Sequence, residues 1–186
     1  MAATNNSDQQ RLQELINRLA VVRGQVTLSS GKHADYYIDL RRITLHHEGA
    51  PLVGKLMSEM LAAHTYEYQA VGGLTLGADP IAMAMLHAKA TLEQPLDAFV
   101  VRKAAKSHGM QRQIEGPEIK GRAVVVVEDT TTTGASPITA IHAAREAGAE
   151  VVAVATIVDR DTGAREAIEA LGVPYHALYQ LADLDI

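Results

Sequence analysis

The sequence predicts an α/β fold in which helices cover both faces of a doubly wound, mostly parallel sheet. Apolar runs alternate with helical patterns along most of the chain, an order that is typical of this class. The runs at 124–127 and 151–154 are apolar throughout, which favours strands buried on both faces. No linker, repeat or low-complexity tract divides the 186 residues. We therefore expect a single domain at 1–186, with an N-terminal helix and hood at about 1–45 and an α/β core at about 46–186.

The first 64 residues predict two helices and a pair of extended segments. Ser7 and Asp8 can start the first helix, whose apolar stripe has helical spacing: Leu12, Leu15, Ile16 and Leu19. Short extended segments at 25–28 and 36–40 flank a turn-rich stretch. A second helix is expected at about 49–64, where apolar residues again share one face.

The alternating part of the chain has one interruption. Apolar runs predict strands at 70–73, 97–102, 123–128, 151–158 and 175–179, and helical patterns predict helices at 80–92, 136–147 and 163–171. The polar stretch between Arg102 and Gly121 is too rich in Gly and Pro for a core element. Structureless connections longer than about 12–15 residues are uncommon and often functional. This stretch is therefore a candidate functional loop, with a surface hairpin as the alternative.

The composition excludes several classes of protein. Hydrophobic residues make up 47% of the chain and charged residues 21%, which excludes a disordered tail. Lys and Arg number 17 against 22 Asp and Glu, so the net charge is −5, and this argues against a nucleic-acid binder. There is no cysteine, no secretion signal and no apolar run of the roughly 18 residues that a membrane span needs. We expect a cytoplasmic protein that binds neither nucleic acid nor membranes.

A phosphate-binding pattern follows the apolar run at 124–127. Ligands bind at the carboxyl ends of strands in an open parallel sheet. Here Glu128 and Asp129 precede a run of hydroxyl-bearing and small residues: Thr130, Thr131, Thr132, Thr133, Gly134, Ala135 and Ser136. Such donors at a helix N-terminus favour a phosphate, whereas the carboxylates suit sugar hydroxyls or a hard cation. The pattern indicates a sugar-phosphate site, and the alternative is a strand end followed by an ordinary helix cap.

Other motifs match less well. No GxxxxGK sequence is followed by Ser or Thr, and GGLTLG at 72–77 lacks the GxGxxG spacing of dinucleotide-binding proteins. His46, His47 and Glu48 lack the spacing of the HExxH zinc motif. We therefore expect no metal site built from protein side chains alone.

The composite string VVVVEDTTTTGAS resembles the phosphoribosyl diphosphate (PRPP) signature of type I phosphoribosyltransferases. Three further segments, in the expected order, are similar to orotate phosphoribosyltransferases: SSGKHADYYIDLR at 29–41, VRKAAKSHG at 101–109 and IVDR at 157–160. The resemblance implies a type I phosphoribosyltransferase-like fold with a mobile catalytic loop. It implies transfer of the phosphoribosyl group of PRPP to orotate, giving orotidine 5′-monophosphate and pyrophosphate. It also implies Mg²⁺ carried by PRPP, and a homodimer with shared sites in which Lys103 serves the neighbouring subunit.

Matching positions give the residues roles by resemblance. The residues implied to bind PRPP are Arg102, Lys103, Lys106, His108, Glu128, Asp129 and every residue from Thr130 to Ser136. Those implied to be catalytic are Lys103, Lys106, His108 and Asp129. Those implied to bind orotate are Lys32, Tyr36, Tyr37, Thr132 and Arg160. The sequence leaves open whether His108 gives pyrophosphate a proton or only a hydrogen bond.

Plain structural interpretations compete with these roles. The cations at 102–108 also fit a solvated basic loop, and Lys32 fits an exposed turn. The two tyrosines also fit a core that is poor in Phe and Trp. Arg160 also fits a surface ion pair with Asp159 or Asp161.

The chain departs from the family pattern in two places, and two rival functions remain open. No lysine lies between Val71 and His87, where some members carry one, and the aromatic pair is Tyr-Tyr where Phe-Phe is frequent. The rivals are a phosphoribosyltransferase for a purine and a PRPP-binding regulator without catalysis. Arg160 favours orotate because a guanidinium matches a carboxylate in a bidentate geometry, and the basic loop favours catalysis.

Overall fold

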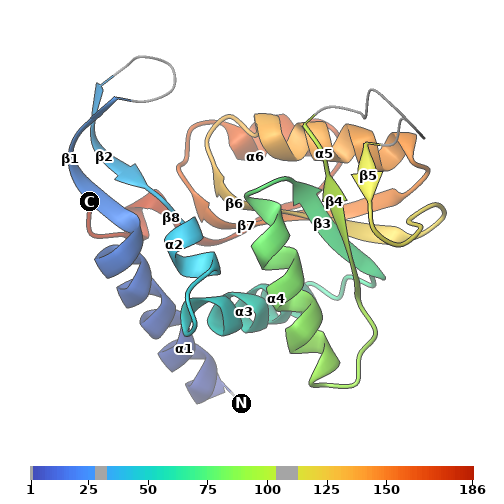
Figure 1. Ribbon diagram of the computed structural model, residues 1–186, viewed down its shortest axis with the longest axis horizontal. Helices are drawn as coiled ribbons and strands as arrows, with labels where there is room; N and C mark the ends of the chain where they lie inside the picture. Colours follow the sequence, from blue (N-terminus) through green and yellow to red (C-terminus); the bar gives the residue numbers. More distant parts are fainter. Residues whose placement is uncertain (1, 28–32, 104–112) are drawn as a thin grey trace.

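The computed structural model describes residues 2–27, 33–103 and 113–186. Within these ranges, six strands form one sheet in the order β5-β4-β3-β6-β7-β8, and β1 with β2 forms a separate two-stranded sheet (Figure 1). The strands are β1 (Val21–Thr27), β2 (His33–Ile38), β3 (Ala70–Leu74), β4 (Asp97–Val101), β5 (Ile114–Glu115), β6 (Ala123–Thr131), β7 (Glu150–Asp159) and β8 (Tyr175–Gln180). The α-helices are α1 (Ala2–Leu15), α2 (Arg41–Thr44), α3 (Gly49–Ala63), α4 (Ala78–Ala90), α5 (Ala135–Glu146) and α6 (Ala164–Glu169). A π-helical turn, Ile16–Ala20, follows α1, and a 3₁₀ turn, Leu181–Asp183, follows β8.

The large sheet is mostly parallel, as the sequence predicts. β3 pairs in parallel with β4 and with β6, and β7 pairs in parallel with β6 and with β8. Among the described strands of this large sheet, only the short β5 is antiparallel, to β4. The crossovers from β3 to β4 and from β6 to β7 each contain a helix, which is the arrangement that parallel strands require.

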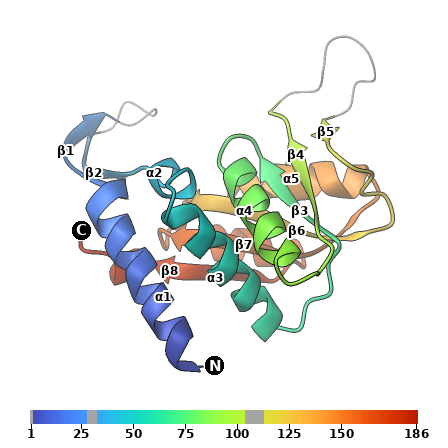
Figure 2. The ribbon, with the colours of Figure 1, turned by 60° about the horizontal axis from the view of Figure 1, so that its bottom comes forward.

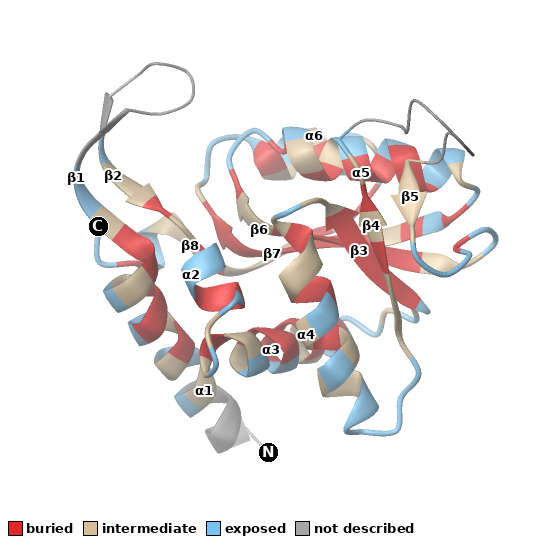
Figure 3. Ribbon diagram, in the orientation of Figure 1, coloured by how far each residue is buried: buried red, intermediate tan, exposed pale blue. Residues whose placement is uncertain are grey.

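Helices cover both faces of this sheet, which confirms the doubly wound fold. α3 and α4 lie on one face with α1 beside them, and α5 and α6 lie on the other (Figures 1 and 2). The valines of β6 divide between the two layers: Val125 and Val127 pack in the core on the α3 side, and Val124 and Val126 pack on the α5 side. Successive side chains in a strand point to opposite faces. A run without polar residues is therefore what a strand buried on both sides needs, and Figure 3 shows the central strands as buried.

The N-terminal helix buries the apolar stripe that its spacing predicts. Leu12, Leu15 and Ile16 have no exposed surface and belong to the core on the α3 side. α1 begins at Ala2, earlier than Ser7. The proposed division into a hood at 1–45 and a core at 46–186 stays a prediction. None of the helices in the described part of the chain is long and apolar enough to cross a membrane.

Several elements differ from those that the sequence predicts: β1 and β2 begin earlier than the expected segments at 25–28 and 36–40. β6 continues to Thr131 rather than ending at Glu128, because Thr130 and Thr131 pair with Val158 and Asp159 of β7. The polar stretch after Arg102 contains the short strand β5, which pairs with β4. The pairing continues with a hydrogen bond from the Arg102 N–H to the Gln113 carbonyl at 2.8 Å. The four-residue α2 was not predicted. Each depends on a partner elsewhere in the fold, so local periodicity does not reveal it.

Candidate active site

A cleft of about 560 Å³ opens at the carboxyl ends of β3, β6 and β7. Its walls come from four parts of the chain: residues 37–41 at the end of β2 and after it, residues 74–77 at the end of β3 and after it, Lys103 after β4, and the end of β6 with the start of α5. Arg160, directly after β7, completes the lining. This is the edge at which ligands bind in open parallel sheets.

The acidic pair lies deep in this cleft. Glu128 is only 6% exposed, and burial together with the charge of Asp129 raises the pKa of Glu128. Burial raises the pKa of Asp129 as well. The Thr130 N–H donates to Asp129 Oδ1 at 2.6 Å and holds that carboxylate in place. Glu128 is buried and Asp129 is half-buried, so both carboxylates lose solvation when they are charged. They therefore gain from a ligand that donates hydrogen bonds to them or brings a positive charge.

The loop between β3 and α4 packs directly against this pair. A Cβ atom at Gly77 would lie 2.1 Å from Glu128 Oε1 and 3.2 Å from Asp129 Oδ1, so the backbone there has room only for a hydrogen. Asp79, in the first turn of α4, accepts a hydrogen bond from the Thr75 hydroxyl at 2.6 Å. Its negative charge also contributes to raising the pKa of Glu128. Backbone atoms of this loop therefore approach the carboxylates closely.

The hydroxyl-rich segment divides between the cleft and the core. Thr130, Thr132 and Ser136 line the cleft. Thr131 is buried, and its hydroxyl donates to Asp159 Oδ1 at 3.3 Å and is also hydrogen-bonded to the Tyr175 hydroxyl. Gly134 has a φ of 78°, a left-handed conformation that glycine adopts without steric cost, and it leads into α5. The N-terminus of α5 thus begins at the edge of the cleft, beside three hydroxyl groups.

Thr133, Gly134 and Ala135 belong to the same segment without forming part of the cleft lining. Thr133 and Ala135 are exposed, and Gly134 is buried against the backbone of Ala164. Their backbone lies next to the cleft, where the chain enters α5.

Arg160 contacts a tyrosine rather than an aspartate. Its Nη2 donates to the Tyr36 hydroxyl at 3.2 Å, and its guanidinium carbon lies 5.3 Å from the centre of the Tyr36 ring. Asp159 accepts hydrogen bonds from Thr131 and from the Asp161 N–H. Within the described residues, no ion pair joins Arg160 to either aspartate, and the buried Arg160 Nε has no hydrogen-bond partner. The surface ion pair considered above is therefore absent from this part of the chain.

Only some of the predicted cationic side chains lie within the described residues. Lys103 is exposed and lines the cleft of its own chain. Arg102 Nη1 lies 3.4 Å from Glu115 Oε1 in an ion pair, and Arg102 is not among the residues that line the cleft. Lys32, Lys106 and His108 lie outside the described residues.

Comparisons with known proteins bear on this cleft. Residues 42–170 match the model of the phosphoribosyl transferase domain family. An orotate phosphoribosyltransferase of Mycobacterium tuberculosis is 59% identical over 179 residues, which cover 96% of this chain and 97% of that protein. One of Streptomyces avermitilis is 64% identical over 94% of this chain and 96% of that protein. The chain belongs to the orotate phosphoribosyltransferase family.

Solved structures of orotate phosphoribosyltransferases agree with the fold. The M. tuberculosis protein in complex with Fe(III) dicitrate is 59% identical, with a TM-score of 0.88 over 96% of this chain and 99% of that chain. The same protein in complex with PRPP is aligned at 54% identity with a TM-score of 0.84, over 96% and 99% of the two chains. The resemblance that the sequence motifs indicate is thereby confirmed for both family and fold.

Two charged residues of the orotate phosphoribosyltransferase cleft were missed by sequence reasoning. Asp39 and Arg41 both line it, and Arg41 Nε donates to Asp39 Oδ1 at 2.9 Å. Both lie within the segment SSGKHADYYIDLR, yet no chemical pattern in that segment singles them out. Their place in the cleft depends on the turn of the chain from β2 into α2, which periodicity did not predict.

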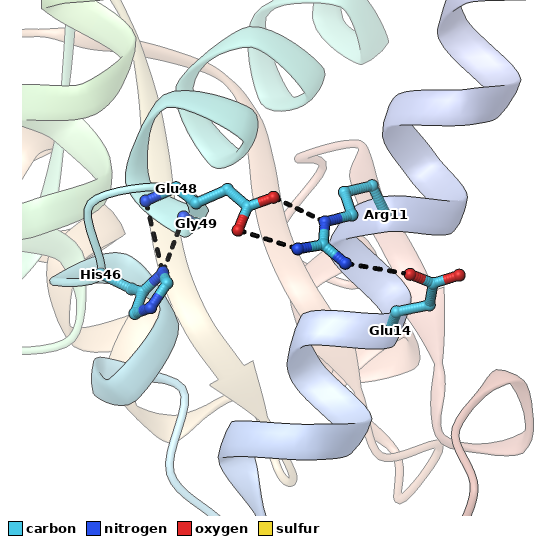
Figure 4. Close-up of polar contacts among 5 residues, drawn as sticks. All are labelled: Arg11, Glu14, His46, Glu48 and Gly49. Carbon is cyan, nitrogen blue, oxygen red and sulfur yellow. Dashed lines mark hydrogen bonds and ion pairs between the residues drawn. The ribbon is translucent and has the colours of Figure 1, made fainter.

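A second cluster of potential metal ligands has a structural explanation. His46, His47 and Glu48 can bring one ligand atom each within 4.8 Å of one another. However, His46 Nδ1 accepts hydrogen bonds from the Glu48 and Gly49 N–H groups at 3.3 and 3.4 Å, which caps the start of α3 (Figure 4). The Glu48 carboxylate is held by Arg11 (Figure 4). His46 Nδ1 and the Glu48 carboxylate are therefore already used to join elements of the fold.

Proposed function

We propose that this protein transfers the phosphoribosyl group of PRPP to orotate, giving orotidine 5′-monophosphate and pyrophosphate. The observation that carries the proposal is the composition of one cleft. The acidic pair of Glu128 and Asp129, the hydroxyl-lined start of a helix and Arg160 all line the same space. The membership in the orotate phosphoribosyltransferase family and the PRPP complex of the M. tuberculosis protein support it.

PRPP would be held at its sugar and at its 5′-phosphate. Glu128 and Asp129 would accept hydrogen bonds from the two ribose hydroxyls, which relieves the cost of burying these carboxylates. The segment 130–136 would hold the 5′-phosphate through backbone N–H groups and hydroxyls at the start of α5. Thr131, whose hydroxyl is bonded within the core, would contribute through its backbone and through the position of the strand end.

The departing pyrophosphate needs positive charge as it leaves. The electron pair of a ring nitrogen of orotate forms the new bond to the anomeric carbon. The bond between the anomeric carbon and the pyrophosphate oxygen breaks, and its electron pair stays with pyrophosphate. The proton that the nitrogen gives up passes to pyrophosphate or to solvent. Lys103 at the rim of the cleft would meet the developing negative charge. The resemblance assigns the same task to Arg102, Lys106 and His108.

The cleft also fits the magnesium ion that PRPP would bring. Mg²⁺ prefers oxygen ligands, keeps several waters and is commonly bound through substrate phosphates. The carboxylates of Glu128 and Asp129 are oxygen donors whose charged form is disfavoured by burial, so a nearby cation suits them. When bound, the ion would neutralise part of the pyrophosphate charge.

Orotate would lie between residues from both ends of the chain. Arg160, directly after β7, offers N–H donors that match the orotate carboxylate in a bidentate geometry. Tyr37 and Thr132 line the same cleft and would contact the pyrimidine. Lys32 is implied to join them by resemblance.

We also propose a cytoplasmic homodimer with shared sites. Large apolar side chains are exposed: Leu76 in the cleft lining is 66% exposed, and Leu45 at the end of α2 is 73% exposed. A second copy would cover such surface. The net charge of −5 supports the absence of nucleic-acid partners.

An ultraviolet assay tests the reaction directly. The purified protein is mixed with PRPP, Mg²⁺ and either orotate, adenine or hypoxanthine, and loss of each base is followed. We expect orotate to be consumed in a PRPP-dependent reaction, with neither purine consumed, because only orotate carries a carboxylate for Arg160. Turnover of a purine without turnover of orotate would reassign the base. PRPP binding with no turnover of any base would point to a regulator.

A further inference from the structure

Tyr36 contacts Arg160 in two ways at once. The hydroxyl accepts a hydrogen bond from Nη2 at 3.2 Å, and the ring faces the guanidinium at 5.3 Å. The two residues are 124 positions apart in the chain, so the contact joins β2 of the small sheet to the end of β7 in the large sheet. A cation over an aromatic ring and a hydrogen bond to the same side chain leave the guanidinium little freedom to turn.

The neighbouring tyrosine has a different environment. Tyr37 lines the cleft, whereas Tyr36 is not among its lining residues. Side chains at successive positions of a strand point to opposite faces, so the two tyrosines of β2 cannot both lie against the same planar base. The aromatic pair therefore divides into one residue that faces the ligand space and one that faces Arg160.

Arg160 keeps donors free despite this contact. Nη2 is used by Tyr36, whereas the buried Nε has no hydrogen-bond partner. An unpaired buried donor carries a free-energy cost, and only Nη2 of the guanidinium takes part in the contact with Tyr36. A guanidinium that is already oriented also loses less side-chain entropy when it binds a carboxylate.

We propose that Tyr36 is a positioning residue that orients Arg160 toward the carboxylate of the pyrimidine, and that Tyr37 alone of the pair contacts the base. This rests on the proposed function, because it assumes that a pyrimidine carboxylate occupies the cleft. It changes the role that resemblance gives to Tyr36, from contact with orotate to support of the residue that contacts it.

Binding of two nucleotides tests this role without requiring turnover. Orotidine 5′-monophosphate and uridine 5′-monophosphate share the ribose, the phosphate and the ring, and differ in the carboxylate. Their dissociation constants are measured by calorimetry for the wild type and for Tyr36→Phe, which keeps the ring and removes the hydroxyl. We expect Tyr36→Phe to weaken binding of the carboxylated nucleotide about three- to tenfold, the effect of losing one hydrogen bond, and to leave the other within about twofold.

Two further variants complete the experiment. Tyr66→Phe removes a comparable hydroxyl that is bonded to His176 Nε2 at 2.9 Å, and neither residue lines the cleft, so both affinities should stay unchanged. Arg160→Met removes the guanidinium. Combined with it, Tyr36→Phe should have no further effect, because its effect passes through Arg160.

Each outcome has a defined meaning. Equal loss of affinity for both nucleotides in Tyr36→Phe would overturn the positioning role, as would a loss that persists in full beside Arg160→Met. No loss at all would overturn it too. A wild type that does not prefer the carboxylated nucleotide would instead count against the proposed function and against any role of Tyr36 that depends on it.

Discussion

At the scale of single residues, the cleft concentrates negative charge where solvent is scarce. Glu128 and Asp129 are adjacent in the chain, and their carboxylates lie beside Asp39 and Asp79, whose charges act on them. Arg41 acts in the opposite direction on Asp129. Such clustering is costly in a ligand-free protein and is common at functional sites. It favours the binding of a ligand that brings hydroxyl donors and a cation.

The cost of burying Glu128 should appear as a pH dependence of the free energy of unfolding of the ligand-free protein. Burial raises the pKa of Glu128 from an ordinary value of 4.5 to about 8. Between these values the folded state holds more protons than the unfolded state, so the free energy of unfolding falls as pH rises through this window, by at most about 1.4 kcal/mol per pH unit for this group. In Glu128→Gln this contribution disappears. We expect the variant to gain stability relative to the wild type between pH 5.5 and 8.5.

Urea unfolding of both proteins at the two pH values measures the difference. The comparison between proteins is needed because other groups titrate in the same range. One of them is His176, whose pKa burial lowers and which acts with the opposite sign. A difference in the free energy of unfolding that is the same at both pH values would show that Glu128 does not titrate in this window.

At the scale of elements, two charged contacts join the N-terminal helix to α3 and its start: an ion pair of Asp8 with Lys55, and a junction of Arg11 with Glu48. Arg11 of α1 donates through Nε and Nη2 to the two carboxylate oxygens of Glu48, at 2.5 and 3.0 Å (Figure 4). Glu48 directly precedes α3, and His46 caps the same helix start. Bidentate arginine pairs are the geometrically specific ones. This junction therefore sets how α1 meets α3, next to the segment that leads into the cleft.

Two glutamates that contact Arg11 allow a matched comparison. Glu14 contacts Arg11 Nη1 from within the same helix at 3.2 Å and is largely exposed. We expect Glu48→Gln to lower the urea midpoint of unfolding, because it removes a link between two helices, and Glu14→Gln to leave it nearly unchanged, because exposed pairs within a helix contribute little. Equal midpoints for the two variants would mean that the junction does not stabilise the fold.

At the scale of the whole molecule, the placement of Lys103 bears on how many chains build one site. Lys103 lines the cleft of its own chain together with Asp129, while the resemblance implies that it serves the neighbouring subunit. The two arrangements differ in which chain supplies the cation beside a given acidic pair. A complementation experiment separates them.

Mixing two inactive variants tests for shared sites. Lys103→Ala and Asp129→Asn chains are unfolded together and refolded, so that mixed dimers form. With shared sites, one site of each mixed dimer is intact, and we expect about a quarter of wild-type activity, since half the dimers are mixed and each has one working site. Chains refolded separately serve as the control. No recovery, with mixed dimers demonstrated by mass, would assign Lys103 to the cleft of its own chain.

An element could be predicted where its own residues determine it, and could not where neighbouring strands do. The unbroken run of valines at 124–127 indicates by itself a strand that is buried on both faces, so β6 was predicted. The helical spacing of apolar residues likewise predicted the buried stripe of α1. The extension of β6 to Thr131 and the two residues of β5 depend on neighbouring strands that complete their hydrogen bonds. Isolated short segments gain too little to be stable alone, and for that reason their sequences hold no strong signal.

The site, too, was partly predictable from the sequence and partly decided by the tertiary structure. By itself, the amino-acid sequence determined the fold class, the family, and the acidic, hydroxyl-rich and basic groups available for chemistry, because each is encoded in a contiguous stretch. Only the tertiary structure decided how those groups divide: Thr131 turns its hydroxyl into the core, Arg102 pairs with Glu115, and Tyr36 lies against Arg160. The direction of a side chain depends on strand register and on partners distant in the chain. That information exists only once the sheet has formed.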